Sequence, residues 1–430
     1  MNFITNTNLV RISKFPVLKK LIFLSFFVFL SFSLSAQESL RAMFYNVLNF
    51  PSGFPQDREF ILKNIVEEID PDILMICELE SENGADRILS ALNSINNEYA
   101  RAPFFPSASQ DFDHQQMIFF KRKKIKLQYS EAIATDVRDL NYYELKINTA
   151  DSLTDPLIIH TFVTHLKSSQ GNANKQLRLE SVQKFFDRTE NLPNDAFVIF
   201  AGDFNFYDHN EPGYQLLIDP SNTIPMVDPS NRVGSWHANR NFMDVHTQST
   251  RVSSGGFGGG AGGGLDDRFD FIMISSNMEN NPKLEYVPNS YAAYGNNGNC
   301  FKQNINDPSC SGIYSQVIRE ELYQMSDHTP VVMDIQTSKQ IVLNTETYEV
   351  QQPFKLHKTI LSDKLEIEVH PDYAASVTFS IYNILGQKVL EFNAENQSHV
   401  NFDVSALSSG VYYLKSNIEK VPALKFLKSS

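Results

Sequence analysis

The sequence predicts an α/β (α+β) fold followed by a small all-β domain, and three observations carry this prediction. Short apolar runs of strand length recur along residues 40–335. Segments with helical spacing lie between them, at Arg58–Ile69 and Lys175–Arg188. Beyond residue 353, only short alternating runs separated by turn residues remain. The chain has 430 residues, of which 42% are hydrophobic and 12% aromatic, so it can build a large core and more than one domain.

The first 36 residues have the pattern of a secretory signal peptide. Basic residues precede the uncharged run Leu21–Ala36, which ends in small residues before Gln37. The run is shorter than the roughly 20 residues of a spanning helix, and its small-residue end favours cleavage. An uncleaved anchor is the alternative. We therefore expect a signal peptide over residues 1–36 and no stable membrane span after processing.

Net charge and cysteines limit the class of protein. The formal net charge is −13, and about −17 once the four basic residues of the signal segment are removed. This balance argues against a protein that coats nucleic acid nonspecifically, but it leaves room for an enzyme with a locally basic groove. Cys77 lies in an apolar run and is expected to be a buried thiol. Cys300 and Cys310 flank a polar loop and either pair after export or stay free.

The first predicted strands end on polar side chains. The alternating run Leu40–Val47 contains Asn46 near its end, and the apolar run Ile73–Cys77 is followed directly by Glu78. A carboxylate at the end of such a strand is suited to a hard cation such as Mg²⁺, which takes one or two protein carboxylates. Taken alone, Glu78 is better explained as a solvated residue at a strand end.

Two further strands lead into polar segments. Met117–Phe120 precedes the basic run Lys121–Lys124, for which a solvated turn is favoured over phosphate binding. Leu157–Thr164 runs into His165, Lys167 and Ser168, whose side chains can all donate hydrogen bonds to an anion. The helix that follows keeps a positive first half through its basic residues, which include Arg178.

The most informative strand is the apolar run that begins at Val198 and stops at Gly202-Asp203-Phe204-Asn205. Its carboxylate and carboxamide, two residues apart, emerge on the same side of the strand. Asp203 can orient a nucleophilic water, while Asn205 offers an amide donor to a phosphoryl oxygen without adding negative charge. For an isolated motif, a strand followed by an Asx turn is the simpler interpretation, so the other segments must decide.

The later part of the first domain adds an acid and an imidazole. The glycine-rich segment Ser253–Gly264 cannot pack a core and is expected to be a mobile loop that overhangs the same end of the molecule. Asp270 then alternates with apolar neighbours in a strand, and a buried acid needs a partner. His328, which follows Asp327, would supply it as a carboxylate-oriented imidazole. The single Trp, Trp236, is expected to pack.

Six segments in this order resemble the endonuclease/exonuclease/phosphatase superfamily, which has the deoxyribonuclease I-like fold. They are Tyr45-Asn46-Val47, Ile76-Cys77-Glu78, Thr164 to Ser168, Gly202 to Asn205, Arg268 to Ile272 and Ser326-Asp327-His328. The resemblance covers about Leu40 to Ile335. It implies a four-layer sandwich of two packed mixed β-sheets flanked by helices, with the site where the loops of the sheets converge.

The resemblance also implies a role for each residue. The metal would be Mg²⁺, with Mn²⁺ or Ca²⁺ as alternatives, held by Glu78 with Asn46 and Asp327 nearby. Five residues would be catalytic, in that they orient the water, stabilise the transition state or donate to the phosphate: His165, Asp203, Asn205, Asp270 and His328. Independently of the resemblance, the chemistry of three side chains suits contacts to the substrate phosphate: Lys167, Ser168 and Arg178.

The substrate is less well defined by the sequence. The segment His165 to Ser168 resembles the secreted bacterial nuclease branch, so a nuclease acting on extracellular nucleic acid is favoured, with DNA preferred over RNA as the partner. A phospholipid phosphodiesterase of the sphingomyelinase kind would need an exposed apolar hairpin, which the glycine-rich loop does not supply. An inositol-phosphate phosphoesterase is a further alternative. A non-catalytic surface-binding module is a third, although clustered acids and imidazoles are costly to keep without a use.

The C-terminal part is predicted to be a separate domain. Residues 37–337 would form the catalytic domain and the polar residues 338–353 a linker. Alternating runs in residues 354–430 predict a small β-sandwich. The segments Ile381 to Val389 and Leu407 to Lys415 resemble the C-terminal sorting domain of the type IX secretion system. The secretion machinery would then be a partner, and the location would be extracellular or on the cell surface. An ordinary immunoglobulin-like domain is the alternative, and the oligomeric state stays open.

Overall fold

The computed structural model describes residues 38–94, 96–109, 114–343, 354–356, 358–369, 377–394, 397, 399–418 and 423–429. The chain divides into two compact units at residue 344. The expected signal peptide over residues 1–36 and most of the expected linker lie outside the described residues. No helix in the described part of the chain combines the length and apolar character that crossing a membrane requires.

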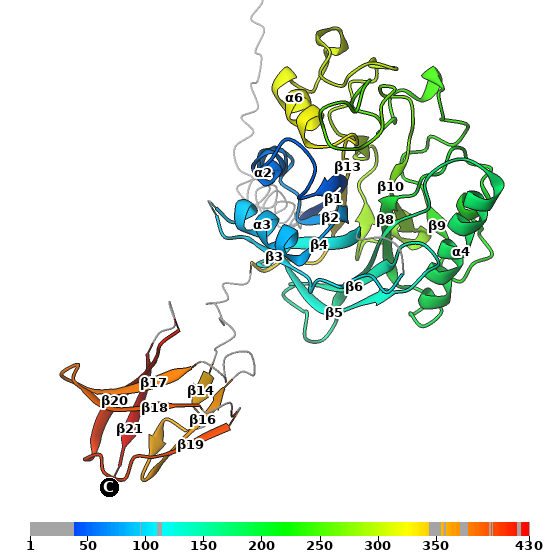
Figure 1. Cartoon of the computed structure of the whole chain (residues 1–430). Coiled ribbons are helices and arrows are strands. Elements are labelled where there is room, and N and C mark those ends of the chain that lie inside the picture. Colours follow the sequence, from blue (N-terminus) through cyan, green and yellow to red (C-terminus); the bar gives the residue numbers. More distant parts are fainter. Residues whose placement is uncertain are drawn as a thin grey trace, which may run out of the picture. The chain divides into compact units, whose positions relative to one another are not determined.

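The first sheet of the first unit is mixed (Figure 1). Strand β1 (Glu38–Phe50) runs parallel to β2 (Ile73–Leu79) and antiparallel to β13 (Val331–Thr337). The strands of this sheet have the order β11-β13-β1-β2-β4-β3, and β12 also pairs with β13. The remaining strands are β3 (Tyr99–Arg101), β4 (Gln115–Lys121), β11 (Glu285–Tyr286) and β12 (Ala292–Ala293).

The second sheet has the order β5-β6-β7-β8-β10-β9 and is also mixed. Strands β7 (Leu157–His165) and β8 (Phe197–Asp203) are parallel, and the other neighbours are antiparallel. The remaining strands are β5 (Ile125–Ile133), β6 (Leu140–Ile147), β9 (Met226–Val227) and β10 (Asp270–Ser275).

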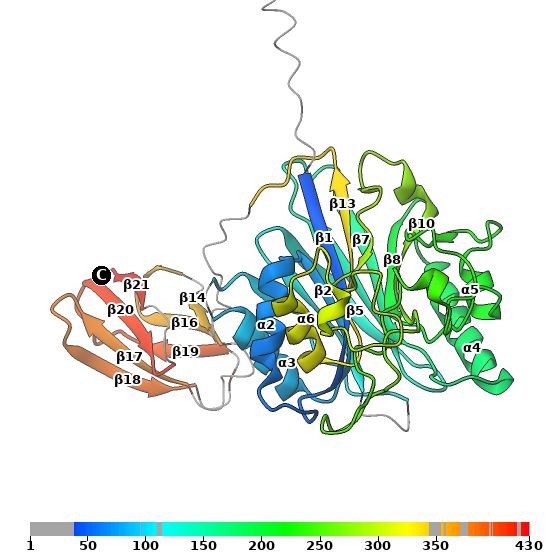
Figure 2. The same cartoon turned by 90° about the horizontal axis from the view of Figure 1, so that it is seen from above.

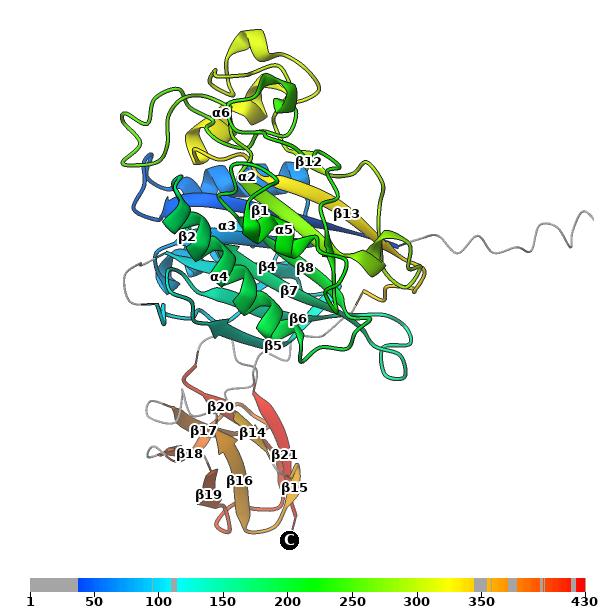
Figure 3. The same cartoon turned by 90° about the vertical axis from the view of Figure 1, so that its right-hand side faces the viewer.

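The two sheets pack face to face, and helices cover both outer faces (Figures 2 and 3). On the first sheet lie α2 (Arg58–Ile69), α3 (Glu82–Leu92) and α6 (Gln316–Met325), whose apolar residues join the core between and around the sheets. On the second lie α4 (Asn172–Thr189) and α5 (Pro212–Leu217), which build a separate aromatic-rich core. Short 3-10 turns occur at Arg240–Phe242, Ser276–Glu279 and Pro308–Cys310. The four-layer α/β sandwich is therefore confirmed.

The predicted elements compare closely with the observed ones. The helix Arg58–Ile69 has the predicted bounds, and the helix predicted over Lys175–Arg188 begins at Asn172 and ends at Thr189. Trp236 is fully buried, and its indole N–H donates to the carbonyl of Phe206 at 2.7 Å. The three helices not predicted, α3, α5 and α6, are short, so their periodicity extends over few residues.

Three smaller expectations are also resolved. Cys300 and Cys310 form a disulfide, and Cys77 is a buried free thiol. Within the basic run, Lys121 and Lys124 form ion pairs with Asp70 and Asp72, next to the start of β2 rather than beside Glu78 at its end. The phosphate-binding alternative for this run is therefore not supported.

The linker begins later than residue 338. The ammonium group of Lys339 contacts the carboxylates of Asp151 and Asp155 at 2.6 and 2.7 Å, and Ile341 forms a β-bridge with Thr149. A polar segment was expected to be solvated, but its lysine finds acidic partners on the first unit. The described residues up to 343 thus belong to that unit.

The second unit is all-β, as predicted. A three-stranded sheet contains β14 (Phe354–Leu356), β16 (Lys364–Val369) and β19 (His399–Asp403). A five-stranded sheet contains β15 (Ile360–Leu361), β17 (Thr378–Asn383), β18 (Lys388–Asn393), β20 (Gly410–Ser416) and β21 (Leu424–Lys428). Alternate residues of these strands form one apolar core, which explains the period of two in the sequence.

Candidate active site

Strand periodicity directs the predicted site residues toward one another. Along β7, Ile159 and Val163 pack in the core between the sheets, so His165 points to the same side. Along β8, Ile199 and Ala201 do the same and are followed by Asp203. In the ladders, Asp203 lies opposite both His165 on β7 and Asp270 on β10. The second sheet thus presents three titratable side chains toward the first.

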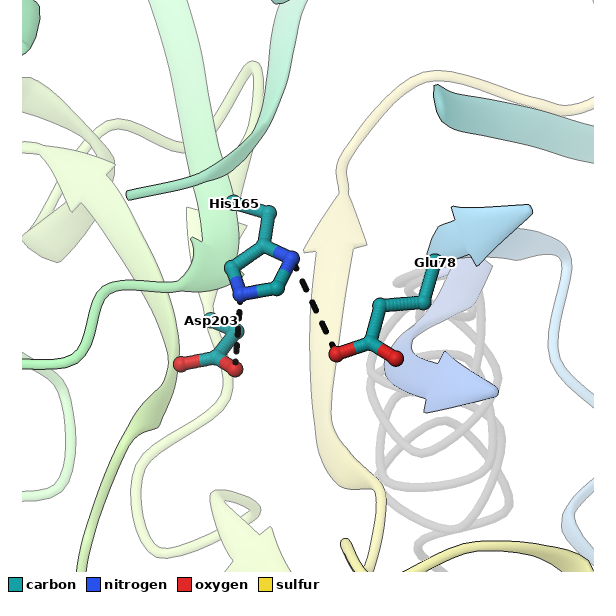
Figure 4. Close-up of side chains that lie close together, drawn as sticks. All are labelled: Glu78, His165 and Asp203. Carbon is teal, nitrogen blue, oxygen red and sulfur yellow. Dashed lines mark ion pairs between the residues drawn. The ribbon is translucent and has the colours of Figure 1, made fainter. Parts of the chain in front are cut away.

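A group of three side chains forms the centre of the site (Figure 4). Glu78 Oε1 lies 3.8 Å from His165 Nδ1, and His165 Nε2 lies 3.4 Å from Asp203 Oδ2. His165 and Asp203 are buried, whereas the Glu78 side chain is 13% exposed and so is the member that solvent reaches most easily. One potential ligand atom from each lies within 4.8 Å of the others, so the three can contact one ion.

Asn46 links the two carboxylates of this group. Its amide nitrogen donates to Glu78 Oε1 at 2.8 Å and to Asp203 Oδ2 at 3.1 Å. Its carbonyl oxygen accepts the N–H of Leu48 at 3.0 Å. Asn46 is fully buried between the sheets. Asn46 therefore holds two acids together. The sequence predicts in addition that Asn46 lies beside the metal.

Asp203 is oriented from its other side by Asn205. The amide nitrogen and the backbone N–H of Asn205 both donate to Asp203 Oδ1, at 2.8 and 3.2 Å. Asn205 adopts a positive φ of 52°, a left-handed conformation that asparagine tolerates better than most residues. The turn that follows β8 is thus built to fix the carboxylate, which confirms the Asx-turn interpretation, while the expected donation from the Asn205 amide to a phosphoryl oxygen stays a prediction.

Asp270 and His328 form the predicted imidazole–carboxylate pair. Nδ1 of His328 lies 2.7 Å from Asp270 Oδ2, and both side chains are buried. Nε2 of His328 lies 3.6 Å from Asp203 Oδ2, so the pair joins the first group through that carboxylate. Asp203, Asp270 and His328 accordingly make a second group of potential ligands.

The pKa shifts follow from this crowding. Burial is the main cause that raises the pKa of Asp203, to about 8. The negative charges of Asp270 and Glu78 raise this pKa further, whereas the charge of His328 lowers it. Burial alone would lower the pKa of His328, but the charges of Asp270, Asp327 and Asp203 outweigh it and raise the pKa well above its usual value. For His165, burial followed by the nearby cation of Arg138 lowers the pKa, so its imidazole is neutral at pH 7.

The donor set fits a hard divalent cation. Carboxylate oxygens dominate both groups, and a neutral imidazole can serve as a further ligand. Oδ1 of Asp270 and Nδ1 of His165 are buried without a hydrogen-bond partner among the residues described. Buried acids that face one another in this way need a positive partner, which a cation would provide.

Asp327 occupies a different position from the one expected beside the metal. It is part of neither group of potential ligands in the described chain. Its Oδ2 atom accepts the backbone N–H of Ala261 at 2.6 Å and contacts Gln248 Nε2 at 3.3 Å. The carboxylate therefore ties the glycine-rich loop to the site. That loop overhangs this end of the molecule, as predicted.

Arg178 is not available to a substrate phosphate. It is fully buried on α4 and makes a two-pronged contact with Glu211, at 2.8 and 3.0 Å. Its guanidinium also donates to the carbonyls of Lys167 and Ser169 at 2.7 and 3.0 Å. The predicted phosphate contact is wrong, because a distant carboxylate turns this arginine inward. Lys167 and Ser168 are partly exposed in the loop that Arg178 supports.

The sequence interpretation missed Gln248 and Arg138. Gln248 Nε2 lies 2.7 Å from His328 Nε2, and its backbone pairs with both His328 and Asp267. Arg138 is buried, donates to the carbonyl of Leu166 at 3.0 Å, and adds positive charge near Glu78 and Asp203. Both residues lie outside the named helices and strands, in segments without a distinctive pattern, so only the fold brings them to the site.

Comparison with solved structures finds several proteins similar to the first unit. D. rerio TDP2 complexed with a single-strand DNA product is 18% identical, covers 70% of this chain and 100% of that chain, and has a TM-score of 0.46. The human Nocturnin catalytic domain with bound sulfate is 16% identical, covers 70% and 97%, and scores 0.42. An endonuclease/exonuclease/phosphatase family protein from Bacteroides thetaiotaomicron is 14% identical, covers 70% and 96%, and scores 0.44. At these values the likenesses carry no conclusion about activity.

The sequence comparisons concern the second unit. No curated protein matches the chain. A family model described as a secretion system C-terminal sorting domain matches residues 361–426. This range runs from the end of β15 into β21, so it contains most of the C-terminal unit. The second unit is therefore a secretion system C-terminal sorting domain, and it marks the chain for export by type IX secretion to the cell surface or the extracellular space.

Proposed function

We propose that the first unit is a divalent-metal-dependent phosphodiesterase, and specifically a secreted nuclease that prefers DNA. The observation that carries the proposal is the shared position of Asp203, which joins the Glu78–His165 group to the Asp270–His328 pair. A phosphodiester is an anion whose hydrolysis needs charge neutralisation, an oriented water and a proton donor near the departing oxygen. Acids, amides and imidazoles of the required kinds converge here.

Glu78 would hold the cation, with His165 and Asp203 as neighbouring ligands, while the amide nitrogen of Asn46 keeps the two carboxylates together. A bound Mg²⁺, or Mn²⁺ or Ca²⁺ in its place, would supply positive charge against the phosphate oxygens. The amide of Asn205 keeps Asp203 in one orientation, so this carboxylate can align an attacking water.

The Asp270–His328 pair would act on the phosphate. Because Asp270 accepts from Nδ1, the Nε2 atom of His328 is the one that faces the other site residues. With the Gln248 amide turned so that its nitrogen no longer faces the ring, a protonated Nε2 would donate to a phosphate oxygen and stabilise its growing negative charge. Lys167 and Ser168 lie on the loop after β7 and would contact nonbridging oxygens.

Cleavage assays test the proposal. The purified mature protein is incubated with plasmid DNA, RNA and sphingomyelin, each with Mg²⁺ and with a chelator. We expect cleavage of DNA that depends on Mg²⁺ and is lost in the chelator. Cleavage of sphingomyelin alone would identify a phospholipid phosphodiesterase, and no cleavage of any phosphodiester would favour the non-catalytic binding module.

A further inference from the structure

A second imidazole–carboxylate pair lies at the surface of the first unit. Nδ1 of His237 is 2.5 Å from Oδ1 of Asp267. The His237 side chain is 39% exposed, whereas the side chain of His328 in the catalytic pair is 2% exposed. The outer pair is thus accessible to a ligand, and the proposed catalytic chemistry does not use it.

This pair is connected to the catalytic centre through backbone contacts. The backbone of Asp267 pairs with Gln248, whose side chain contacts His328. The backbone N–H of His237 donates at 3.4 Å to the carbonyl of Tyr207, which is two residues beyond Asn205. The pair therefore belongs to the same cluster of loops as the site.

A further hydrogen-bond donor and an aromatic ring lie beside the exposed imidazole. Nε2 of Gln170 lies 3.1 Å from Nε2 of His237, on the loop that carries Lys167. The ring of Tyr207 packs edge-on against the imidazole, with centroids 5.0 Å apart. An anion oxygen is an acceptor that both the imidazole ring and the amide of Gln170 can reach.

Two aspartates close to the imidazole have positive partners. Asp267 is occupied by His237 itself, and the carboxylate of Asp266 faces the ammonium group of Lys302 at 3.5 Å. Arg178 and Glu211 add no net charge, because they form a buried pair. These carboxylates are therefore paired and do not oppose an anion at His237.

The buried Arg178–Glu211 pair holds this surface in place. Arg178 donates to the carbonyls of Lys167 and Ser169, and Glu211 accepts the backbone N–H of Tyr207 at 2.9 Å. One buried ion pair thus fixes both loops that flank His237. Fixed donors bind an anion with less loss of conformational entropy than mobile ones.

We propose that Gln170, Tyr207 and His237 form a second phosphate subsite, which takes the phosphate next to the scissile one. The subsite rests on the proposed function, since it assumes a phosphodiester in the catalytic centre. It favours a substrate with neighbouring phosphates, as in a nucleic acid strand or an inositol polyphosphate, over a lipid such as sphingomyelin with a single phosphate. The strand is the occupant to which we commit.

The test compares minimal substrates that differ by one phosphate. The substrates are the dinucleotide d(TpT) and its forms with one further phosphate at the 5′ or the 3′ end, with Mg²⁺ present. For the wild-type protein we expect one of the two phosphorylated forms to have a kcat/KM about tenfold or more above that of d(TpT). His237→Ala and Gln170→Ala should each remove this gain while leaving the rate on d(TpT) unchanged.

Matched variants serve as controls. Gln215 donates to the carbonyl of His209 at 2.6 Å, so His209→Ala and Gln215→Ala change the same residue types one loop away and should keep the gain. No gain in the wild-type protein, or a gain that survives in both test variants, would overturn the subsite. Comparing kcat/KM for an inositol bisphosphate with that for an inositol monophosphate shows whether the subsite also accepts inositol polyphosphates.

Binding measurements separate this subsite from the proposed function. Dissociation constants of labelled d(TpT) and its phosphorylated forms are measured alongside turnover. If the wild-type protein cleaves neither form but still binds the phosphorylated one more tightly, and His237→Ala removes that difference, the nuclease proposal fails and the subsite stands. Equal affinities in all proteins would remove the subsite whether or not cleavage occurs.

Discussion

Asp203 Oδ2 lies 3.4 Å from His165 Nε2 and 3.6 Å from His328 Nε2, so one buried carboxylate lies between two imidazoles. The two rings are held in opposite states, since burial and Arg138 lower the pKa of His165 while three carboxylates raise that of His328. A neutral ring can bind a cation, and a charged ring can donate to a phosphate. Under the proposed function, the centre would thus separate metal binding from phosphate binding.

Removing the charge of Asp270 should disable the charged ring. Asp270→Asn keeps the shape of the side chain but no longer favours a protonated His328. We expect kcat on DNA to fall by about 100-fold or more, because an oriented acid or base contributes this much to a proton transfer. Steady-state kinetics provide the measurement. Asp266→Asn, four residues earlier and outside the catalytic centre, should stay near the wild-type rate, and equal losses in both variants would contradict the assigned role.

Removing the ligand with the greatest access to solvent should abolish stabilisation by metal. In the wild-type protein, Mg²⁺ at about 100 times its Kd adds about 2.7 kcal/mol of stability, which raises Tm by roughly 5 to 10 °C for a unit of this size. Glu78→Gln should lose most of this rise. Glu80→Gln is the control, since Glu80 lies two residues further on and binds the Ser52 hydroxyl at 2.6 Å. Thermal unfolding with and without Mg²⁺ measures both, and a full rise in Glu78→Gln would exclude Glu78 as a ligand.

The metal-free protein should lose stability as the pH rises. The pKa of Asp203 is raised to about 8 by burial, and that of His328 is raised by its carboxylate neighbours, so both groups bind protons more tightly in the folded state. A group with a raised folded pKa stabilises below its unfolded pKa, and this contribution is lost as the pH rises through the folded value. Between pH 4 and about 8, Asp203→Asn should therefore lose less stability than the wild type. Denaturant unfolding in a chelator tests this, and parallel pH profiles would show that Asp203 does not titrate as described.

Breaking the buried pair beneath the loops should destabilise the first unit. Arg178→Met leaves the carboxylate of Glu211 buried and uncompensated, and the expected loss is about 3 to 5 kcal/mol of unfolding free energy. Arg178→Met combined with Glu211→Leu should recover much of it, because no unpaired charge remains. Urea denaturation measures both proteins. Lys167→Ala should change stability little, and an equally small effect of Arg178→Met would mean that the pair does not support the fold.

Much of the fold was predictable because the signal is local. Apolar strand runs and helical spacing mark the two sheets, and polar residues such as Glu78 and Asp203 lie at or near the ends of these strands. Asp270 could be matched with His328 because a buried acid inside a strand requires a partner. The positions of these side chains follow from strand parity, which the sequence carries directly.

The incorrect and missing assignments depend on partners that are distant in the sequence. Arg178 was placed at the phosphate because its charge suggested it, but its partner Glu211 lies 33 residues away in a turn-rich segment. A signal was present, since Arg178 shares the buried face of α4 with Val182 and Phe185 at helical spacing. Gln248 reaches His328 from across the chain, and no local pattern marks such a contact.

Anomalous X-ray diffraction from crystals of the mature protein grown with Mn²⁺ tests the central claim most directly. The account predicts a metal peak in contact with the Glu78 carboxylate, in the group that also contains His165 and Asp203, and no peak there in crystals of Glu78→Gln. A fully occupied metal elsewhere on the first unit, with this group empty, would contradict it.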